Sequence, residues 1–132
     1  MTQQAQHEAA VRATALDYAE GWYEGDVERM ERCLHPNLVK RQLRRDPETG
    51  AAVFEHFTKE DMVRFTKQGL GKQVPREKIY YKVDITEVFR EVAMVRCESA
   101  LYVDFLQLVY ENGRWLIVNV LYATTEHFPY TG

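Results

Sequence analysis

Residues 102–124, YVDFLQLVYENGRWLIVNVLYAT, decide the fold of this chain. Two runs rich in Val, Ile, Leu, Tyr and Phe flank Asn112-Gly113, and this dipeptide between such runs is typical of a tight β-hairpin turn. Side chains alternate between the two faces of a strand. In residues 114–124 one face carries Trp115, Ile117 and Leu121, and the other carries Leu116, Val118, Val120 and Tyr122. Both sides of the predicted sheet must therefore be covered.

The predicted sheet continues upstream of this hairpin. Residues 78–88 and 92–99 also alternate and join 102–111 and 114–124 in a four-stranded meander. A second, more irregular hairpin is predicted for 38–45 and 51–57. The turn between them is Asp46-Pro47-Glu48-Thr49-Gly50, in which Pro sets φ and Gly permits a left-handed exit.

Helical spacing characterises the beginning of the chain. From about Gln6 to Tyr23, apolar residues recur on one face of a predicted amphipathic helix: Val11, Ala15, Tyr18 and Trp22. Gly25 and Asp26 end this helix. The first element is therefore a long helix with one apolar side.

Two shorter helices are predicted after it. Asp26 can cap the first, whose stripe of Val27, Met30 and Leu34 runs until Pro36 ends the helix. Thr58 with Asp61 resembles a capping box for the next helix, which Gly69 can close. Three helices suffice to cover one side of the sheet, so we expect the other side to pack on a second copy of the chain, in a homodimer.

Size and charge exclude several classes of protein. We expect the 132 residues to form one domain spanning 1–132, with its core at about 8–124. The net charge of -3 gives no basic footprint for nucleic acid. The longest apolar stretch is too short to span a bilayer, and the polar start is no signal peptide, so we expect a cytoplasmic protein without a membrane partner. Neither Cys33 nor Cys97 lies in a C-x-x-C motif or a His-rich cluster, so we interpret both as structural thiols. No metal or cofactor is implied.

Five blocks of sequence, which with their spacing extend over residues 8–124, carry a family resemblance. They are YAEGWYEGD (18–26), LHP (34–36), LVKR (38–41), YVDF (102–105) and GRWLIVNVL (113–121). They resemble the nuclear transport factor 2-like superfamily, which includes ketosteroid isomerase, scytalone dehydratase and small polyketide cyclases, and within it the lumazine-binding branch. The resemblance implies an α+β fold. Its cone-shaped, curved, mixed and mainly antiparallel sheet wraps a long N-terminal helix, with three helices and a pocket open at one end.

In this fold the first helix supplies a wall of the pocket. Tyr18 and Trp22 lie on its apolar stripe, and such side chains can stack on a flat ligand or hydrogen-bond to it. The alternative is that both are ordinary core aromatics. Counting back from Gly25-Asp26, Tyr18 falls where the resemblance to ketosteroid isomerase implies an oxyanion-hole tyrosine.

The acid and base of an isomerase are harder to find. The isomerase's proton-abstracting aspartate maps onto Gln42, an amide that cannot accept a proton at neutral pH. Asp104 is the candidate for the remaining acid of the isomerase. Alignment through the Asn112-Gly113 turn puts it one residue away from the matching position, and a shift of one residue moves a side chain to the other face of the strand unless a bulge compensates. His35, next to Pro36, is a candidate acid or base near the pocket mouth. The alternatives are a turn or capping role for Asp104 and a helix-terminal role for His35.

Four further residues are candidate ligand contacts. Alternation places Lys40, Gln42 and Arg44 on one face and Arg41, Leu43 and Arg45 on the other, so only half of this basic cluster can face inward. We select Arg41, because a guanidinium binds an anionic or carbonyl-rich ligand bidentately. Gln42 and Phe65 complete the candidate pocket, with core packing as the alternative for Phe65. Asn119 is either a pocket contact or is bonded to a neighbouring strand.

Three functions are consistent with these patterns. The first is a protein that binds a small organic molecule, planar and heteroaromatic in our expectation, in an aromatic-lined pocket. The second is a cofactor-free dehydratase, cyclase or isomerase with His35 or Asp104 as acid or base and Tyr18 polarising a carbonyl. The third is a dimeric protein-interaction module whose pocket is vestigial. A titratable group beside Tyr18 in the pocket would favour the enzyme.

Overall fold

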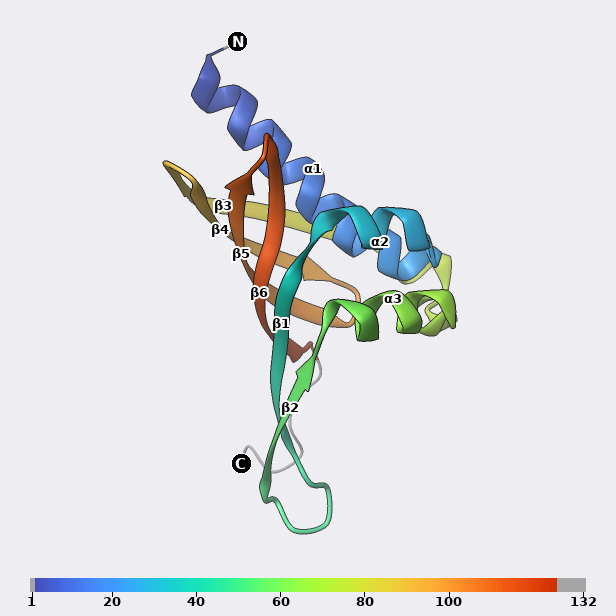
Figure 1. Ribbon diagram of the computed structural model, residues 1–132. Coiled ribbons are helices and arrows are strands. Elements are labelled where there is room, and N and C mark those ends of the chain that lie inside the picture. The colour runs from blue at the N-terminus through green and yellow to red at the C-terminus, as the bar shows by residue number, and fades with distance from the viewer. Residues whose placement is uncertain (1, 126–132) are drawn as a thin grey trace.

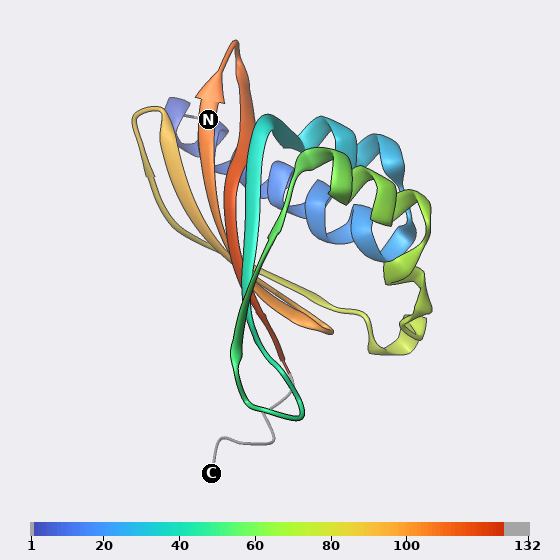
Figure 2. The same ribbon diagram turned by 60° about the horizontal axis from the view of Figure 1, so that its bottom comes forward.

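A six-stranded sheet carries three helices on one of its faces (Figure 1, Figure 2). The computed structural model describes residues 2–125. The helices are α1 (Gln3–Glu24), α2 (Val27–Cys33) and α3 (Lys59–Lys67), followed by the short 3-10 helices η1 (Leu70–Gln73) and η2 (Arg76–Lys78). The strands are β1 (Leu34–Arg45), β2 (Ala52–Phe57), β3 (Tyr81–Phe89), β4 (Val92–Ser99), β5 (Tyr102–Glu111) and β6 (Arg114–Thr124).

The sheet is mixed, and its strand order is β2-β1-β6-β5-β4-β3. β1 pairs in parallel with β6, and every other pairing is antiparallel. Within the described chain the end strands β2 and β3 do not pair with each other, so the curved sheet remains open. The predicted α+β fold with a curved mixed sheet against a long first helix is confirmed.

Local signals explain where the helices begin and end. The Thr2 side chain accepts a hydrogen bond from the Ala5 N–H and caps α1, while Gly25 adopts φ 68° and ends it. Asp26 caps α2 through the Arg29 N–H, and Thr58 with Asp61 forms the predicted capping box of α3. These contacts satisfy N–H groups that the first turn of a helix leaves without partners.

The structure corrects the predicted end of α2 and the predicted starts of β1 and β3. β1 begins at Leu34 instead of residue 38, so Pro36 lies within the strand and does not end a helix. α2 ends at Cys33, because Leu34 is already extended and pairs with Ile117 of β6, whereas the sequence predicts Leu34 in the helical stripe. Pairing with the central strand therefore outweighs the local helical pattern. Residues 76–78 form η2, so β3 begins at Tyr81 instead of residue 78. The last three strands have the predicted bounds.

A bulge in β6 corrects the predicted faces of that strand. Gln107 pairs with Asn119 but the next residue, Leu108, pairs with Ile117, so Val118 is an extra residue in β6. An extra residue reverses the alternation beyond it. Trp115 and Ile117 therefore share the buried inner face with Val120, whereas Asn119 and Leu121 lie on the outer face.

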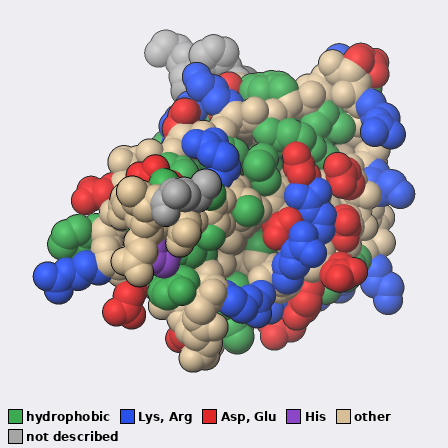
Figure 3. Space-filling view, turned by 90° about the horizontal axis from the view of Figure 1, so that it is seen from above, with side chains coloured by type: hydrophobic (Ala, Val, Ile, Leu, Met, Phe, Trp, Pro, Cys, Tyr) green, Lys and Arg blue, Asp and Glu red, His purple; other side chains and the backbone are tan. Residues whose placement is uncertain are grey.

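The helices are joined by a charged network. Asp17 of α1 accepts hydrogen bonds from Arg29 (Nε–Oδ1, 2.9 Å) and Arg32 (Nε–Oδ2, 2.9 Å) of α2, and Arg29 also bonds Glu20 at 2.5 Å. On the face of the molecule seen in Figure 3, acidic and basic side chains are interspersed. The network holds α2 across α1, above the inner face of the sheet.

Candidate functional site

A buried lysine, Lys40, lies between α1 and the inner face of the sheet. It is on β1, two residues after the buried Leu38, so strand alternation carries it to the same face. Tyr18 comes from the buried face of α1, and Asp104 comes from β5. Lys40, Tyr18 and Asp104 are only 7%, 4% and 4% exposed, so three polar side chains from three elements meet in the core.

The Tyr18 hydroxyl connects the lysine to the aspartate. Lys40 Nζ donates a hydrogen bond to Tyr18 Oη at 2.5 Å, and Tyr18 Oη donates to Asp104 Oδ1 at 3.1 Å. Lys40 Nζ and Asp104 Oδ1 are 3.9 Å apart. A tyrosine hydroxyl can accept and donate at the same time. The three groups therefore form a continuous path along which a proton can move.

Four aromatic rings surround the Lys40 amino group. Its Nζ atom lies 4.4 Å from the ring centre of Tyr122, 5.0 Å from Tyr18, and 5.8 Å from both Trp22 and Tyr102. Ring faces attract a cation within about 6 Å. They also exclude water, so the amino group lies in an aromatic cage of the chain's own making.

Burial disfavours the charged forms of all three groups. It lowers the pKa of Lys40, an effect that the negative charge of Asp104 opposes. It raises the pKa of Asp104, against the influence of Lys40 and of the Tyr18 hydrogen bond. Burial and then the nearby Asp104 charge raise the pKa of Tyr18 well above its ordinary value. The environment thus brings the amine and the acid closer to their neutral forms than they are in water.

The cavity beside these groups is small. It is lined by Tyr18, Ala19, Trp22, Tyr23, Lys40, Ser99, Tyr102 and Asp104, and its free volume is about 10 Å³. That is room for about one water molecule. Trp22 Nε1 is buried and has no hydrogen-bond partner among the described residues. The wall of the cavity therefore contains one spare donor, and the half-buried Trp22 and Tyr102 form its outer part.

Several predicted residues meet here. Tyr18, Trp22 and Asp104 all line the cavity. Asp104 faces inward with Leu106 and Leu108 of β5. Gln42 lies one step further along β1, where its Oε1 accepts a hydrogen bond from the Tyr122 hydroxyl at 2.9 Å. Tyr18 and Trp22 thus lie together at this cavity, with Asp104 beside the tyrosine.

His35 and Phe65 lie elsewhere. His35 is in β1 instead of at the end of a helix, with its Nε2 3.4 Å from Glu111 Oε1 and its Nδ1 accepting from the Asn37 N–H. Phe65 packs edge-to-face against Phe57 at 5.7 Å. Neither side chain lines the cavity. Early entry into β1 and packing of α3 against β2 account for these two positions.

Arg41 and Asn119 face the opposite side of the sheet. Both line a depression of about 420 Å³ on the outer face, together with Phe54, Met94, Phe105 and Leu121. Asn119 Nδ2 donates to Gln107 Oε1 on the neighbouring strand at 3.1 Å, which is the second of the two roles considered for it. Alternation turns Arg41 outward because Lys40 is turned inward, and the bulge turns Asn119 outward.

The sequence analysis missed Lys40, Tyr102 and Tyr122. A signal for Lys40 was present, since alternation groups it with Gln42 and with the apolar Leu38. Of the basic residues, the sequence analysis selects Arg41, which lies on the other face of the strand. Tyr122 is brought inward by the bulge at Val118, which period-two alternation does not reveal.

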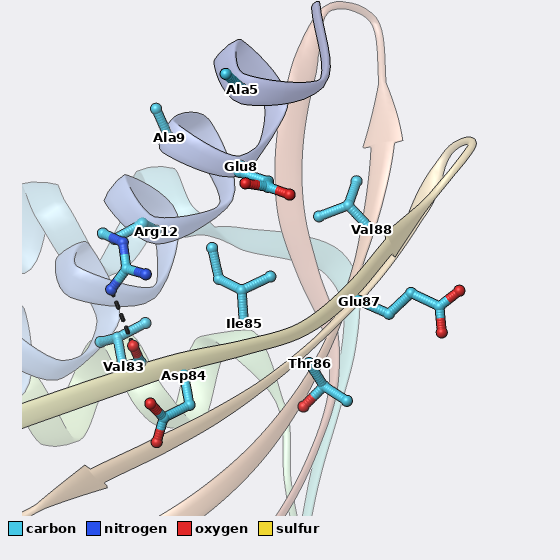
Figure 4. Close-up of a pocket in the computed structure, with 10 residues that line it drawn as sticks. All are labelled: Ala5, Glu8, Ala9, Arg12, Val83, Asp84, Ile85, Thr86, Glu87 and Val88. Atoms are coloured by element: carbon cyan, nitrogen blue, oxygen red, sulfur yellow. Dashed lines mark hydrogen bonds between the residues drawn. The ribbon is translucent and has the colours of Figure 1, made fainter.

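A larger cleft lies between α1 and the edge strand β3 (Figure 4). It has a volume of about 500 Å³, and Arg12 Nη1 donates a hydrogen bond across it to the Val83 carbonyl at 2.9 Å. Figure 4 shows Ile85 and Val88 directed toward α1, whereas Asp84 and Glu87 point away from it. The acidic groups of this cleft therefore do not converge.

Residues 2–125 contain no group of three or more His, Cys, Asp or Glu side chains placed to hold a metal ion. None of the described helices combines the length and the apolar character needed to cross a membrane.

Comparison with known families and structures gives consistent results. The family model described as "Putative lumazine-binding" matches residues 6–123. The curated proteins contain no match to the chain. Among solved structures, a nuclear transport factor 2-like protein of unknown function from Silicibacter pomeroyi is similar, with 19% identity, coverage of 94% of this chain and 99% of that one, and a TM-score of 0.73.

Two further structures show the same fold. One is a nuclear transport factor 2-like protein of unknown function from Shewanella baltica, with 16% identity, coverage of 96% and 100%, and a TM-score of 0.72. The other is a ketosteroid isomerase-like protein from Erwinia carotovora, with 13% identity, coverage of 90% and 96%, and a TM-score of 0.60. At these identities the likeness concerns the fold alone.

Proposed function

The chain belongs to this lumazine-binding family, within the nuclear transport factor 2-like superfamily, and on that premise we propose that it binds a small organic molecule at the cavity around Lys40. One observation carries the proposal. A buried lysine, tyrosine and aspartate are joined by hydrogen bonds inside a cage of aromatic rings, next to an unpartnered indole N–H. Convergent polar groups with shifted pKa values in an apolar pocket are typical of a binding site.

The proposed ligand is planar and carries a carbonyl or anionic group. Its polar edge would reach the Lys40 amino group, and its ring would lie against the half-buried faces of Trp22 and Tyr102. Only the edge fits at Lys40, because the free volume there is about 10 Å³. Binding of a whole ring thus requires Tyr102 or Trp22 to turn outward. Lumazine and other flat heteroaromatic compounds have this combination of ring and carbonyl groups.

A thermal-shift screen tests the binding proposal. Lumazine, pterins, flavin precursors, steroids and aromatic polyketides are added separately to the folded chain. A compound at about 100 times its Kd stabilises the native state by about 2.7 kcal/mol, which raises the Tm by several degrees. The shift should be absent in Lys40→Met and unchanged in Lys82→Met, which removes an exposed lysine of β3.

The outcome also decides about the third function. Suppose that no compound shifts the Tm and that Lys40→Met is as stable as the parent. The Lys40, Tyr18 and Asp104 side chains would then neither bind a ligand nor stabilise the fold. A vestigial pocket in an interaction module would then be favoured. The small free volume is the observation that supports that alternative.

A cofactor-free lyase or isomerase is the second candidate function. It is favoured by the hydrogen bond between Tyr18 and Asp104, since burial raises the pKa of Asp104 and a protonated carboxyl can donate to a carbonyl. Exchange of ketone α-protons in D₂O, followed by NMR, measures such proton transfer. We expect Asp104→Asn to reduce the exchange rate by about 10²-fold or more. Exchange no faster than in buffer would exclude this activity for the ketones tried.

We also propose that the outer face of the sheet joins two copies of the chain. Leu43, Phe54, Met94, Phe105 and Leu121 are each about half exposed there. The three helices cover the other face, so no helix of the described chain covers these apolar groups (Figure 2). A contiguous apolar patch of this kind favours an interface, and a twofold dimer would cover it with an identical surface.

The cytoplasm remains the proposed compartment. Cys33 and Cys97 are both buried and unpaired. Free thiols are typical of reducing compartments, whereas secreted proteins tend to form disulfides. Fractionation of cells that express the chain, followed by immunodetection, would locate it.

A further inference from the structure

We propose that Lys40 is a nucleophilic amine that forms a Schiff base with a small aldehyde, a role that rests on the proposed binding at its cavity. Nothing in the family match or in the similar structures assigns this residue a reaction. Its position on the inner face, between a tyrosine and an aspartate and behind aromatic walls, is the basis of the inference.

The surroundings of Nζ favour an amine over an ammonium ion. An ammonium carries three N–H donors. Within the described chain only the Tyr18 hydroxyl accepts a hydrogen bond from Nζ, and Asp104 Oδ1, at 3.9 Å, lies beyond hydrogen-bond distance. The remaining neighbours include ring faces, which attract a cation, but burial acts against the charge and is the largest influence on the Lys40 pKa. A neutral amine leaves fewer donors unsatisfied and retains its lone pair.

Tyr18 provides the route by which the amine loses its proton. The proton passes from Nζ to the tyrosine oxygen while the tyrosine proton passes to Asp104 Oδ1. Both hydrogen bonds are buried, so no water is required. The products are a neutral amine and a neutral carboxylic acid. Because burial lowers the pKa of Lys40 and raises that of Asp104, it favours this transfer from both ends.

The reaction balances with the aldehyde as its only co-reactant. The Nζ lone pair attacks the carbonyl carbon and forms a C–N bond, while the carbonyl oxygen takes the proton that Asp104 supplies through Tyr18. The nitrogen then returns one proton to Asp104 along the same path. The carbinolamine hydroxyl takes that proton and leaves as water as the C=N bond forms. The result is a protonated Schiff base beside an ionised Asp104.

The space at Nζ limits the substrate class. A cavity of about 10 Å³ admits a group of about the size of a water molecule. An aldehyde presents one hydrogen and one oxygen beside its carbon, whereas a ketone presents a second carbon. The unpartnered Trp22 N–H is a spare donor in the wall of this cavity. Even a small aldehyde exceeds this free volume, so its entry also requires Trp22 or Tyr102 to turn outward, and the smallest, unbranched aldehydes are therefore the expected reactants.

The nearest thiol does not compete with the amine. Cys97 is on β4, directly paired with Asp104, and is 1% exposed. Burial, reinforced by the nearby Asp104, raises the pKa of the Cys97 thiol to about 12. Since the thiolate is the reactive form, this thiol is inert at neutral pH.

Reductive trapping tests the proposal. The folded protein is incubated at pH 7 with propionaldehyde and sodium cyanoborohydride, which converts a Schiff base into a stable propylamine, and the sites are mapped by peptide mass spectrometry. The exposed lysines Lys67, Lys72, Lys78 and Lys82 are internal controls. At pH 7 an ordinary lysine is neutral in only about one molecule in 2,500. Lys40 should therefore be labelled at least about tenfold faster than these four.

Two tyrosine variants test the role of the proton path. Tyr18→Phe removes the hydroxyl between Lys40 and Asp104 and should slow labelling of Lys40 by about tenfold or more. Tyr110→Phe makes the same change where the ring packs on His7 and Trp115, outside the cavity, and should leave labelling unchanged. Circular dichroism confirms that each variant is folded. The dependence of labelling on pH should also be flatter for Lys40 than for the exposed lysines.

The result distinguishes this proposal from the binding proposal. Labelling of Lys40 no faster than of the exposed lysines in the folded parent protein would refute the nucleophile, even if a flat compound still raises the Tm. A Tm shift by that compound would leave the binding proposal intact. Selective labelling without any Tm shift in the ligand screen would support the nucleophile and count against the planar ligand.

Discussion

At the residue scale, two adjacent basic residues have opposite surroundings. Lys40 is buried among aromatic rings on the inner face, whereas Arg41 lines the depression on the outer face. Strand alternation alone separates them. The chemistry of the inner site is therefore that of a desolvated amine, whose pKa burial can lower, and not that of a guanidinium, which stays charged.

The buried pair should show strong coupling in a double-mutant cycle. Lys40→Met removes the hydrogen-bond partner of the buried Tyr18 hydroxyl and interrupts the chain to Asp104, and we expect a loss of about 1–3 kcal/mol in the free energy of unfolding. Replacing both groups, as in Lys40→Met with Asp104→Leu, should recover part of that loss, because fewer buried polar groups then lack a partner. Urea denaturation measures both. Strictly additive losses would mean that the two side chains do not interact.

Part of this site could be predicted from the sequence. Tyr18 and Trp22 follow from helical spacing, and the family resemblance marks Asp104. Alternation places Lys40 on the same strand face as the apolar Leu38. A strand pattern does not indicate whether a charged residue on that face is exposed or buried. Burial depends on what packs above the strand, and here α1 covers it.

At the element scale, the extra residue at Val118 organises β6. Without it, Asn119 and Leu121 would share the inner face with Ile117, and Tyr122 would lie on the outer face, away from the cavity. A strand pattern with apolar residues on both faces conceals such a bulge, since either phase appears equally favourable. The bounds of β4, β5 and β6 were predictable from their alternating apolar residues and from the Asn112-Gly113 turn between β5 and β6. The phase of β6 was not predictable in this way.

A close contact between η1 and α1 should make Gly71 sensitive to substitution. A Cβ atom at position 71 would lie 2.3 Å from the Trp22 carbonyl oxygen and 2.7 Å from its Cδ1 atom. Gly71→Ala must therefore displace η1 or Trp22, at a cost of about 1–3 kcal/mol. Thermal unfolding and near-UV circular dichroism measure the loss and the change around the indole. Gln73→Ala, an exposed change in the same short helix, should have little effect.

The bonds between α1 and α2 should depend on pH through Asp17. Burial acts to raise the pKa of Asp17, but hydrogen bonds from Arg32 and Arg29 outweigh it, so the folded-state pKa lies below the ordinary value of 3.8. The stabilisation is therefore present above pH 3.8 and is lost as the pH falls through the lower folded-state value. Asp17→Asn should cost about 1 kcal/mol at pH 7.

Urea denaturation at several pH values checks this assignment. The difference in stability between the parent and Asp17→Asn should shrink below about pH 4. Glu28→Gln makes the same change of charge at an exposed position of α2. If it showed an equal loss with the same pH dependence, the effect would reflect overall charge instead of the Asp17 contacts.

At the scale of the whole molecule, the sheet separates two apolar surfaces. The inner one forms the core with the helices, and the outer one is exposed. Apolar residues on both faces of β6 were visible in the sequence and led to the expectation of a second copy. The structure shows which of those residues lie on the outer face. How a second copy would pack there depends on the shape of that face, which the sequence pattern does not indicate.

A charge on the outer face should prevent self-association. Phe105 is 53% exposed at the centre of the proposed interface. Phe105→Glu would bury a carboxylate against apolar side chains, so sedimentation velocity should show a monomer where the parent is a dimer. Leu70→Glu makes a similar change on η1 and should leave the dimer intact. A monomeric parent protein would contradict the proposal directly.

The place of β6 in the sheet has a consequence for synthesis on the ribosome. β6 lies between β1 and β5, so it connects the β1–β2 hairpin to the β3–β5 meander, yet of the described strands it is made last. A nascent chain lacking residues 114–124 has two separate sheets, each with an open edge at the missing position. Those edges are templates for wrong pairing. The two edges therefore stay exposed to wrong pairing until residues 114–124 have emerged and β6 fills the position between them.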